Sequence, residues 1–152
     1  MNLVKMSEKD FDNYLNIAIP EYAEDKITAG TWKKSEAIHL ATESYANLLP
    51  KGIHTPNNFL FSIMTSSSIG PIGMIWVKST DKKLFIYDFM INEEYRGKGY
   101  GKKSLISLDN WASEHQFEEI GLHVFAHNKS AHQLYKKMGY VETDITMVRK
   151  IE

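Results

Sequence analysis

Residues 84–104, LFIYDFMINEEYRGKGYGKKS, join an apolar, strand-like run to a glycine-rich basic segment that leads into helical sequence. A backbone that leaves a strand and then begins a helix exposes several N–H groups, and glycines let an anion approach them. Arg96, Lys98, Lys102 and Lys103 add positive charge at the same place. The segment therefore predicts a pocket for phosphate oxygens.

Two better-known phosphate loops do not fit this segment. A P-loop requires Gly-Lys-Ser/Thr after an earlier glycine, but Gly101-Lys102 is followed by Lys103, and position 96 is Arg. A dinucleotide fingerprint has G-x-G-x-x-G spacing, whereas the glycines at 97, 99 and 101 are spaced G-x-G-x-G. An ordinary tight turn with surface lysines remains the structural alternative.

The composition limits the other classes of protein that need to be considered. At 152 residues we expect one domain over residues 1–152, and 18 basic against 19 acidic side chains give no global field that would indicate nucleic acid or an anionic membrane as a partner. The chain has no cysteine, which excludes thiol nucleophiles and disulfides. Without an apolar signal segment or a run of ~20 apolar residues, we expect a cytoplasmic protein.

The order of predicted elements is that of a mixed sheet covered on both faces. Ser7 is a candidate N-cap for a first helix, and because proline cannot continue a helix without losing a hydrogen bond, a second helical stretch is predicted from Pro20 towards Ala29. Predicted helices then follow at residues 35–48, 99–114 and 128–138. The predicted strands cover residues 3–6, 59–64, 72–77, 84–91, 120–125, 140–142 and 146–150.

Two motifs resemble the GNAT superfamily of acyl-coenzyme A-dependent N-acyltransferases. Arg96, Gly99 and Gly101 match the family's Gln/Arg-x-x-Gly-x-Gly/Ala pyrophosphate loop, directly after a strand and at the start of a helix. Residues 123–140, HVFAHNKSAHQLYKKMGY, resemble its second signature: a strand, an Asn at a helix start, a Tyr seven residues on, and a closing Gly-Tyr. The likeness covers essentially the whole chain, although residues 1–58 match only in layout.

The resemblance implies a fold, an activity and a ligand. The expected fold is α/β (α+β), with a mixed, mostly antiparallel twisted sheet of six to seven strands and about four helices on its two faces. The expected activity is transfer of an acetyl group from acetyl-coenzyme A to a primary amine by direct attack in a ternary complex. The residues that correspond to the family's coenzyme site are Phe89, Met90, Ile91, Arg96, Gly97, Lys98, Gly99, Tyr100, Gly101, Lys102, Asn128 and Tyr135.

The catalytic candidates are Tyr135 and Asp88. Asn128 and Tyr135 are about two helical turns apart and therefore lie on one face of their helix, and in the family the tyrosine hydroxyl lies near the sulfur. We interpret Tyr135 as the general acid or the group that stabilises the thiolate, with a rim tyrosine of the core as the alternative. Asp88 is a candidate general base. Asn128 alone could be an N-cap.

The acceptor site is the least defined part of the prediction. The resemblance places it at the first two helices and near the loop of residues 55–58, so Glu21, Glu24 and Asp25 become candidates for substrate binding or for the general base. They favour a cationic acceptor weakly, and a solvated acidic helix face is the alternative. We expect no metal, because on a strand His123 and His127 would be about 13 Å apart.

Two readings from other classes stay open. One is an acyl-coenzyme A-binding sensor, or an inactive relative that keeps the phosphate loop without turnover. The other is an unrelated α/β module that holds a different phosphate ligand. For partners, the sequence interpretation includes a small-molecule or peptide amine and a homodimer, and it includes neither nucleic acid nor a membrane.

Overall fold

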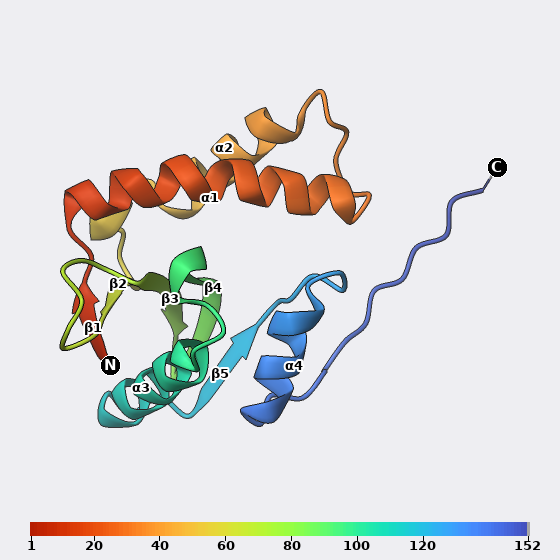
Figure 1. The fold of residues 1–152 in the computed structure, drawn as a ribbon. Coiled ribbons are helices and arrows are strands. Elements are labelled where there is room, and N and C mark those ends of the chain that lie inside the picture. The colour runs from red at the N-terminus through yellow and green to blue at the C-terminus, as the bar shows by residue number, and fades with distance from the viewer. Residues whose placement is uncertain (152) are drawn as a thin grey trace.

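A computed structural model describes residues 1–151, and Figure 1 shows its central five-stranded sheet. The strands lie in chain order: β1 (Asn2–Lys5), β2 (Asn58–Met64), β3 (Gly73–Thr80), β4 (Lys83–Ile91) and β5 (Glu119–Leu122). The first three pairings are antiparallel, and β4 pairs with β5 in parallel. The predicted mixed, mostly antiparallel sheet is therefore confirmed.

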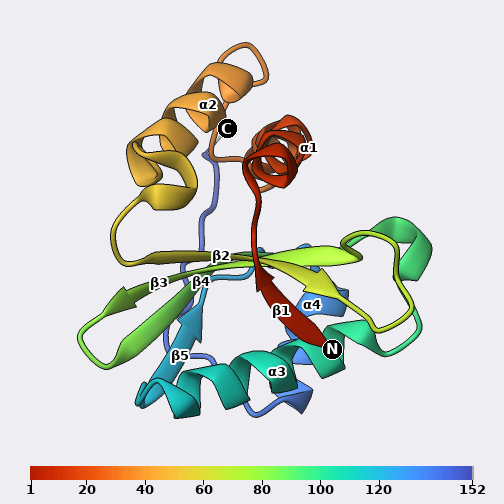
Figure 2. The same ribbon diagram turned by 90° about the vertical axis from the view of Figure 1, so that its left-hand side faces the viewer.

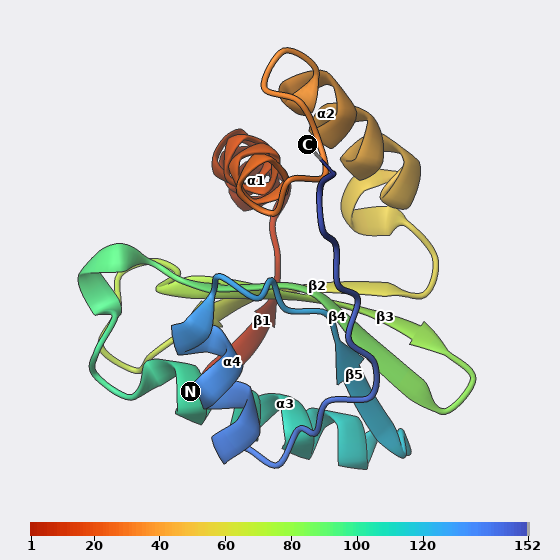
Figure 3. The same ribbon diagram turned by 90° about the vertical axis from the view of Figure 1, so that its right-hand side faces the viewer.

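Helices cover both faces of the sheet, two on each. Figures 2 and 3 show α1 (Glu8–Thr28) and α2 (Ala37–Leu48) on one face and α3 (Tyr100–Glu114) and α4 (Lys129–Lys137) on the other. Alternate strand residues pack towards opposite faces: Trp76 lies in the cluster under α1 and α2, whereas Ile75 and Val77 lie in the cluster under α3 and α4. None of the helices described for residues 1–151 combines the length and apolar character needed to cross a bilayer.

Pro20 does not divide α1, so the prediction of a second helical stretch starting there was wrong. Pro20 and Asn16, whose carbonyl loses the i→i+4 hydrogen bond, are both exposed, and water can therefore satisfy that carbonyl. Buried Phe11 and Ala23 meanwhile hold the two halves of the helix against the protein. Tertiary packing and solvent access outweigh the local preference of proline. The predicted end near Ala29 is confirmed, since the helix ends at Thr28, Ala29 is its C-cap, and Gly30 beyond it has a positive φ of 77°.

The C-terminal part of the sheet is smaller than predicted. Within residues 1–151 the sheet has five strands instead of six to seven, because the predicted strands at 140–142 and 146–150 are absent and β5 ends at Leu122. Residues 141–151 instead run in extended form away from α4, as Figure 1 shows in dark blue. Their strand-like composition is real, but no neighbouring strand pairs with it in this single chain.

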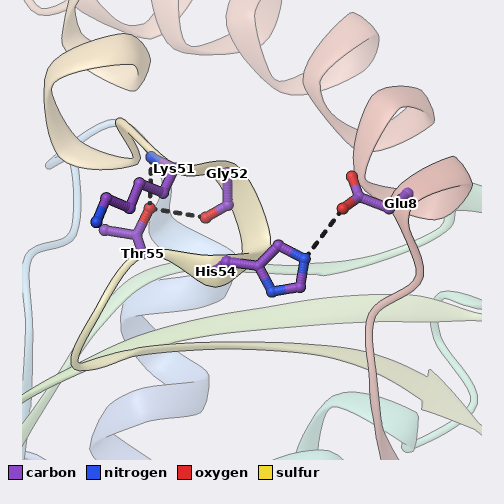
Figure 4. A network of polar contacts seen from close by, with 5 residues as sticks. All are labelled: Glu8, Lys51, Gly52, His54 and Thr55. Carbon is purple, nitrogen blue, oxygen red and sulfur yellow. Dashed lines mark hydrogen bonds and ion pairs between the residues drawn. The ribbon is translucent and has the colours of Figure 1, made fainter.

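A short turn anchors the start of α1 to the segment that leads into β2. In Figure 4 the buried Thr55 donates a hydrogen bond from Oγ1 to the Gly52 carbonyl at 2.8 Å and accepts one from the Lys51 N–H at 3.1 Å. Beside it, His54 Nε2 lies 3.2 Å from Glu8 Oε1. These contacts form a structural corner at residues 51–55.

Candidate functional site

A cavity of about 910 Å³ lies where α1 and α2 face the C-terminal half of β4 and the start of α4. Its walls come from six parts of the chain: the second half of α1, α2, Trp76 of β3, β4 from Phe85 onwards, the turn that begins α3, and residues 122–137. Residues far apart in the sequence thus line one space. Most of the predicted site residues lie on it.

The edge of β4 is open where the cavity meets it. The parallel pairing of β4 with β5 stops at Ile86 and Leu122, whereas β4 continues to Ile91. A register shift opposite Trp76 and Val77 leaves Tyr87 without a partner on β3 and bends the strand at this point. The predicted coenzyme residues 89–91 therefore have a backbone edge that can accept an extended ligand.

The backbone donors along this edge are not equivalent. The Phe89 N–H already donates to Asp88 Oδ1 at 2.9 Å. The Asn92 N–H donates to the carbonyl of Ile72, the residue just before β3. By the alternation of an antiparallel ladder, the Ile91 N–H therefore faces the open side. Ile91 is therefore the residue of the predicted trio whose amide is directed towards a ligand on this edge.

The glycine-rich turn presents backbone amides to the same cavity. Gly97 and Gly99 adopt positive φ angles of 75° and 82°, which allow the chain to enter α3 directly. The first hydrogen bond of this helix runs from the Lys103 N–H to the Gly99 carbonyl at 3.2 Å. The amides of residues 100–102 precede it and have no partner within the helix, as a phosphate-binding helix start requires.

The other predicted loop residues have separate roles. Arg96 Nε donates to the Ile91 carbonyl at 2.7 Å and ties the turn to the end of β4. A side chain at Gly101 would meet Leu134 of α4 at 3.1 Å, so glycine permits close packing there. Tyr100 and Lys102 line the cavity, whereas Lys98 is exposed and is not part of its wall.

Helix α4 brings Asn128 and Tyr135 to the cavity together. Asn128 caps the helix, since its Oδ1 accepts a hydrogen bond from the Ala131 N–H at 3.4 Å, so the N-cap interpretation is confirmed alongside its position on the cavity wall. Tyr135 is buried, with 9% of its surface exposed. Burial, together with the negative charge of Asp88, raises the pKa of Tyr135 to about 12. Its hydroxyl therefore keeps its proton at neutral pH and can act as a donor.

Asp88 is partly buried and accepts two hydrogen bonds from within the protein. The Tyr14 hydroxyl of α1 donates to Asp88 Oδ2 at 2.5 Å, and the Phe89 N–H donates to Oδ1. Burial raises the pKa of Asp88 above the ordinary value; the two hydrogen bonds lower it, and the charges of Glu21 and Asp25 raise it further. Asp88 is thus a more basic carboxylate than one in water.

The three predicted acidic residues of α1 do not share one environment. Glu21 and Asp25 line the main cavity, and Asp25 Oδ1 lies 2.8 Å from His127 Nε2. Glu24 instead lines a smaller adjacent pocket of about 400 Å³, together with Glu21, Asp25 and Arg96. Residues 55–58, which we expected to shape the acceptor site, do not line the cavity, and the buried Thr55 instead belongs to the corner in Figure 4.

Sequence reasoning missed Tyr14 and Tyr45 as site residues. Tyr14 donates a hydrogen bond to Asp88, and burial and the charge of Asp88 both raise the pKa of Tyr45. The rings of these two residues meet edge to face at 6.3 Å, and burial raises the pKa of both. Each occupies an apolar position in a helical repeat, which predicts a core residue and nothing more. No sequence signal indicates a hydrogen bond that spans 74 residues.

Comparisons with known proteins agree with this geometry. Residues 20–140, more than half of the chain, match the family model described as acetyltransferase (GNAT) family. The chain is 38% identical to the uncharacterized N-acetyltransferase YycN of Bacillus subtilis (strain 168), over 98% of this chain and 97% of that protein, and 35% identical to YdgE of the same organism over the same shares.

Solved structures give the same result. The crystal structure of YycN superposes with a TM-score of 0.95 at 37% identity, over 99% of this chain and 98% of that one. The PaiA N-acetyltransferase of Thermoplasma acidophilum, solved in complex with coenzyme A, has a TM-score of 0.73 at 20% identity, over 95% of this chain and 92% of that chain, which shows a shared fold. The strand–turn–helix motif, the sheet with its open β4 edge and the whole-length relatives lead to one conclusion: this chain belongs to the acetyltransferase (GNAT) family.

Proposed function

We propose that this protein is an N-acetyltransferase that moves the acetyl group of acetyl-coenzyme A to a primary amine by direct attack in a ternary complex. One observation carries the proposal: a single cavity joins the free helix amides of residues 100–102, the open edge of β4, Tyr135 and Asp88. These are the groups that acetyl transfer from a thioester requires.

The cavity fits the parts of coenzyme A in order. The amides at the start of α3 and the cation of Lys102 suit its diphosphate. The edge of β4 suits its peptide-like pantetheine arm, because an extended ligand can add to a strand whose edge is free. Asn128 lies on the same wall. The complex of the related-fold PaiA protein with coenzyme A supports this class of ligand.

The side chains near the thioester end would divide the chemistry between them. The acceptor nitrogen bonds to the thioester carbonyl carbon, the carbon–sulfur bond breaks with its electron pair on sulfur, and the amine proton leaves towards Asp88, directly or through water. The Ile91 N–H is aimed at the open edge, where a carbonyl oxygen becomes negative. Tyr135 donates a hydrogen bond to the departing sulfur, since with a pKa of about 12 its full deprotonation is unfavourable.

The acidic wall favours a cationic acceptor. Glu21 and Asp25 project from α1 into the cavity, and their charges act on Asp88 as well as on any ligand. An alkyl ammonium, with a pKa of about 10.4, is attracted to such a site but must lose a proton before it attacks. A carboxylate with a raised pKa accepts that proton more readily than an ordinary one.

A sensor that binds the coenzyme without turnover is the second candidate, and one observation favours it. Both carboxylate oxygens of Asp88 already accept hydrogen bonds within the protein. If these bonds persist with ligands bound, Asp88 holds the fold together and accepts no proton.

A thiol-release assay separates the two functions. The chain has no cysteine, so a thiol reagent reports only coenzyme A set free. We expect acetyl-coenzyme A to release thiol with at least one cationic amine from a panel of polyamines, aminoglycosides, amino acid amides and peptides. At a ligand concentration of a hundred times Kd, binding of acetyl-coenzyme A should stabilise the folded chain by about 2.7 kcal/mol and raise its melting temperature. If the melting temperature rises but no amine in the panel releases thiol, the sensor is favoured. No thermal shift would contradict both.

A further inference from the structure

One wall of the cavity is built from aromatic rings that contact one another in turn. The ring centroids of Tyr45 and Trp76 are 5.9 Å apart, and Tyr87 stacks on Trp76 at 4.9 Å. Phe85 meets Tyr87 edge to face at 5.1 Å, and at the other end Tyr22 meets Tyr45 at 5.9 Å. All five residues line the cavity, where they form a continuous aromatic row.

The bulge in β4 brings this aromatic row next to the proposed base. Strict alternation would place the neighbours Tyr87 and Asp88 on opposite faces of the sheet. The register skips Tyr87, however, and resumes with Asp88 opposite Trp76, the residue on which Tyr87 stacks. Asp88 also accepts its hydrogen bond from α1. Tyr87 and Asp88 therefore lie side by side on the face that α1 and α2 cover.

The rings of the row are not equally available to a ligand. Tyr45 and Trp76 are buried, and the indole N–H of Trp76 already donates to Asn58 Oδ1 at 2.8 Å. Phe85 and Tyr87 are each 38% exposed, although both lie on the cavity wall. Aromatic surface that stays accessible in a cavity is where the apolar part of a ligand binds.

The charges around the row favour a ligand with a single ammonium group. Asp88 attracts one ammonium, but a lysine stands at each end of the row. Lys26 Nζ lies 5.7 Å from the centre of the Tyr22 ring, and Lys78 is the cross-strand partner of Phe85. A second ammonium on the ligand would be repelled at either end. An uncharged ring meets no such repulsion and gains contact with the exposed aromatic surface.

These observations lead to an inference that rests on the proposed acetyl transfer. We propose that the acceptor is an arylalkylamine, a primary amine that carries an aromatic ring on a short linker. Its nitrogen lies beside Asp88 and its ring packs on Tyr87 and Phe85. Phe85 is three residues before Asp88, about 10 Å along an extended strand, so the row can hold a ring and a short linker. The nitrogen bonds to the acetyl carbon, the carbon–sulfur bond breaks with its electron pair on sulfur, and the nitrogen's proton passes to Asp88 or water.

The first test compares primary amines in the thiol-release assay. Phenethylamine, cyclohexylethylamine, butylamine and putrescine share the reacting group, but only phenethylamine has an aromatic ring. We expect its kcat/KM to exceed those of butylamine and putrescine by ~10-fold, and that of cyclohexylethylamine by ~3-fold, because aromatic pairs contribute beyond the area that they bury. Equal values for phenethylamine and cyclohexylethylamine, or a preference for putrescine, would overturn the proposal.

The second test removes the ring nearest to Asp88. Tyr87→Leu keeps an apolar side chain but loses the aromatic surface. We expect the ratio of kcat/KM for phenethylamine to that for butylamine to fall by ~5-fold, and this ratio cancels any general loss of activity. Ile69→Ala is the control, since Ile69 is fully exposed on a loop and does not line the cavity. A ratio that stays at the native value in Tyr87→Leu would refute the role of the row.

The third test removes the charge at one end of the row. Lys78→Gln should raise kcat/KM for putrescine about threefold relative to butylamine, because it removes a cation that repels a second ammonium. Lys82→Gln is the matched control: Lys82 lies in the turn of the same hairpin and pairs with Glu118. No gain with putrescine in Lys78→Gln would contradict the exclusion of a second ammonium.

Binding without turnover separates this inference from the proposed function. With coenzyme A in place of acetyl-coenzyme A no transfer can occur, and saturation-transfer NMR shows which protons of phenethylamine contact the protein. We expect the ring protons to be saturated more strongly than the methylene protons, and this difference to be lost in Tyr87→Leu. If this pattern is present but no amine releases thiol, the acetyl transfer is refuted and the aromatic subsite stands. If butylamine and phenethylamine are acetylated equally well and the ring protons are not saturated, the transfer stands and the subsite is refuted.

Discussion

The two ends of the cavity are built on different principles. At the proposed phosphate end, residues 96–102 act mainly through the backbone: two glycines have positive φ angles, and the first helix amides have no partner within the helix. One side-chain bond, from Arg96 Nε to the Ile91 carbonyl, ties this turn to a residue only five positions away. At the chemical end, Asp88 works through side chains, and its partner Tyr14 comes from a helix 74 residues earlier. One end is local in sequence and the other is assembled by the fold.

This difference determines how each end should respond to mutation. A backbone site loses function when its conformation is strained, and most side-chain changes around it are tolerated. A buried side-chain cluster loses function when one polar partner is removed, because its electrostatic balance depends on every member. Four substitutions test this contrast, from the largest expected effect to the smallest.

Asp88→Asn should have the largest effect, because it removes the proposed base without changing side-chain volume. We expect kcat to fall by ~10²- to 10⁴-fold, the usual contribution of a positioned general base. The measurement is steady-state thiol release over a range of pH. In the native protein kcat should fall at low pH as Asp88 becomes protonated, and the variant should lack this acid limb of the pH–rate profile. Asp109→Asn, on the exposed face of α3, is the matched control.

Asp88→Asn also tests how the charge of Asp88 affects the stability of the fold as pH changes. The pKa of Asp88 is raised in the folded state, so the ionised carboxylate destabilises the fold. The contribution of Asp88 to the free energy of unfolding is fully present below the unfolded-state pKa and is lost as pH rises through the folded-state pKa. The melting temperature of the native chain relative to Asp88→Asn should therefore fall across this interval. A difference that grows with pH would mean that the hydrogen bonds outweigh burial.

Tyr135→Phe should come next and should separate turnover from binding. Loss of one donor to a developing negative charge lowers kcat by ~10²-fold, while the dissociation constant of coenzyme A should hardly change. Stopped-time thiol release and calorimetric titration measure the two quantities. Tyr140→Phe is a fair control, since its ring lies 5.6 Å away and its buried hydroxyl has no partner within the described residues. Equal losses in both variants would assign Tyr135 to packing alone.

Gly99→Ala tests the backbone end of the comparison. A side chain in the left-handed conformation costs ~1–2 kcal/mol, so either the loop changes shape or the fold is strained, and we expect coenzyme affinity to fall about tenfold. Gly30→Ala provides the control: its φ of 77° imposes the same strain beyond the end of α1, and no atom lies within 4 Å of the added methyl group. If both variants bind coenzyme A as the native chain does, the loop is not the phosphate site.

Tyr14→Phe should have the smallest effect and probes whether the cluster tunes its base. Losing one hydrogen bond of ~1 kcal/mol should slow turnover about fivefold at neutral pH. Since this bond lowers the pKa of Asp88, its loss should move the acid limb of the pH profile to higher pH. Tyr22→Phe, which removes a hydroxyl from the same cavity without touching Asp88, should leave the limb in place.

The sequence by itself predicted the order of the elements between residues 35 and 138, the glycine-rich turn before α3, and the face of α4 that carries Asn128 and Tyr135. Each depends on contacts or φ angles within a few residues, and the spacing of glycines, caps and apolar side chains records such local preferences directly. For the same reason, the two local motifs at residues 96–101 and 123–140 were enough to indicate the family. Glu21, Asp25 and Asp88 were also candidates, but the sequence could not say which of them would be buried.

Only the tertiary structure decided the rest. Packing and solvent access carried α1 straight through Pro20, and the folding of α1 over β4 brought the Tyr14 hydroxyl to Asp88. It also left residues 141–151 without a strand to pair with, although short strands were predicted at 140–142 and 146–150. Burial, long-range hydrogen bonds and strand pairing depend on which residues lie nearby in space. The sequence around a residue does not specify those neighbours.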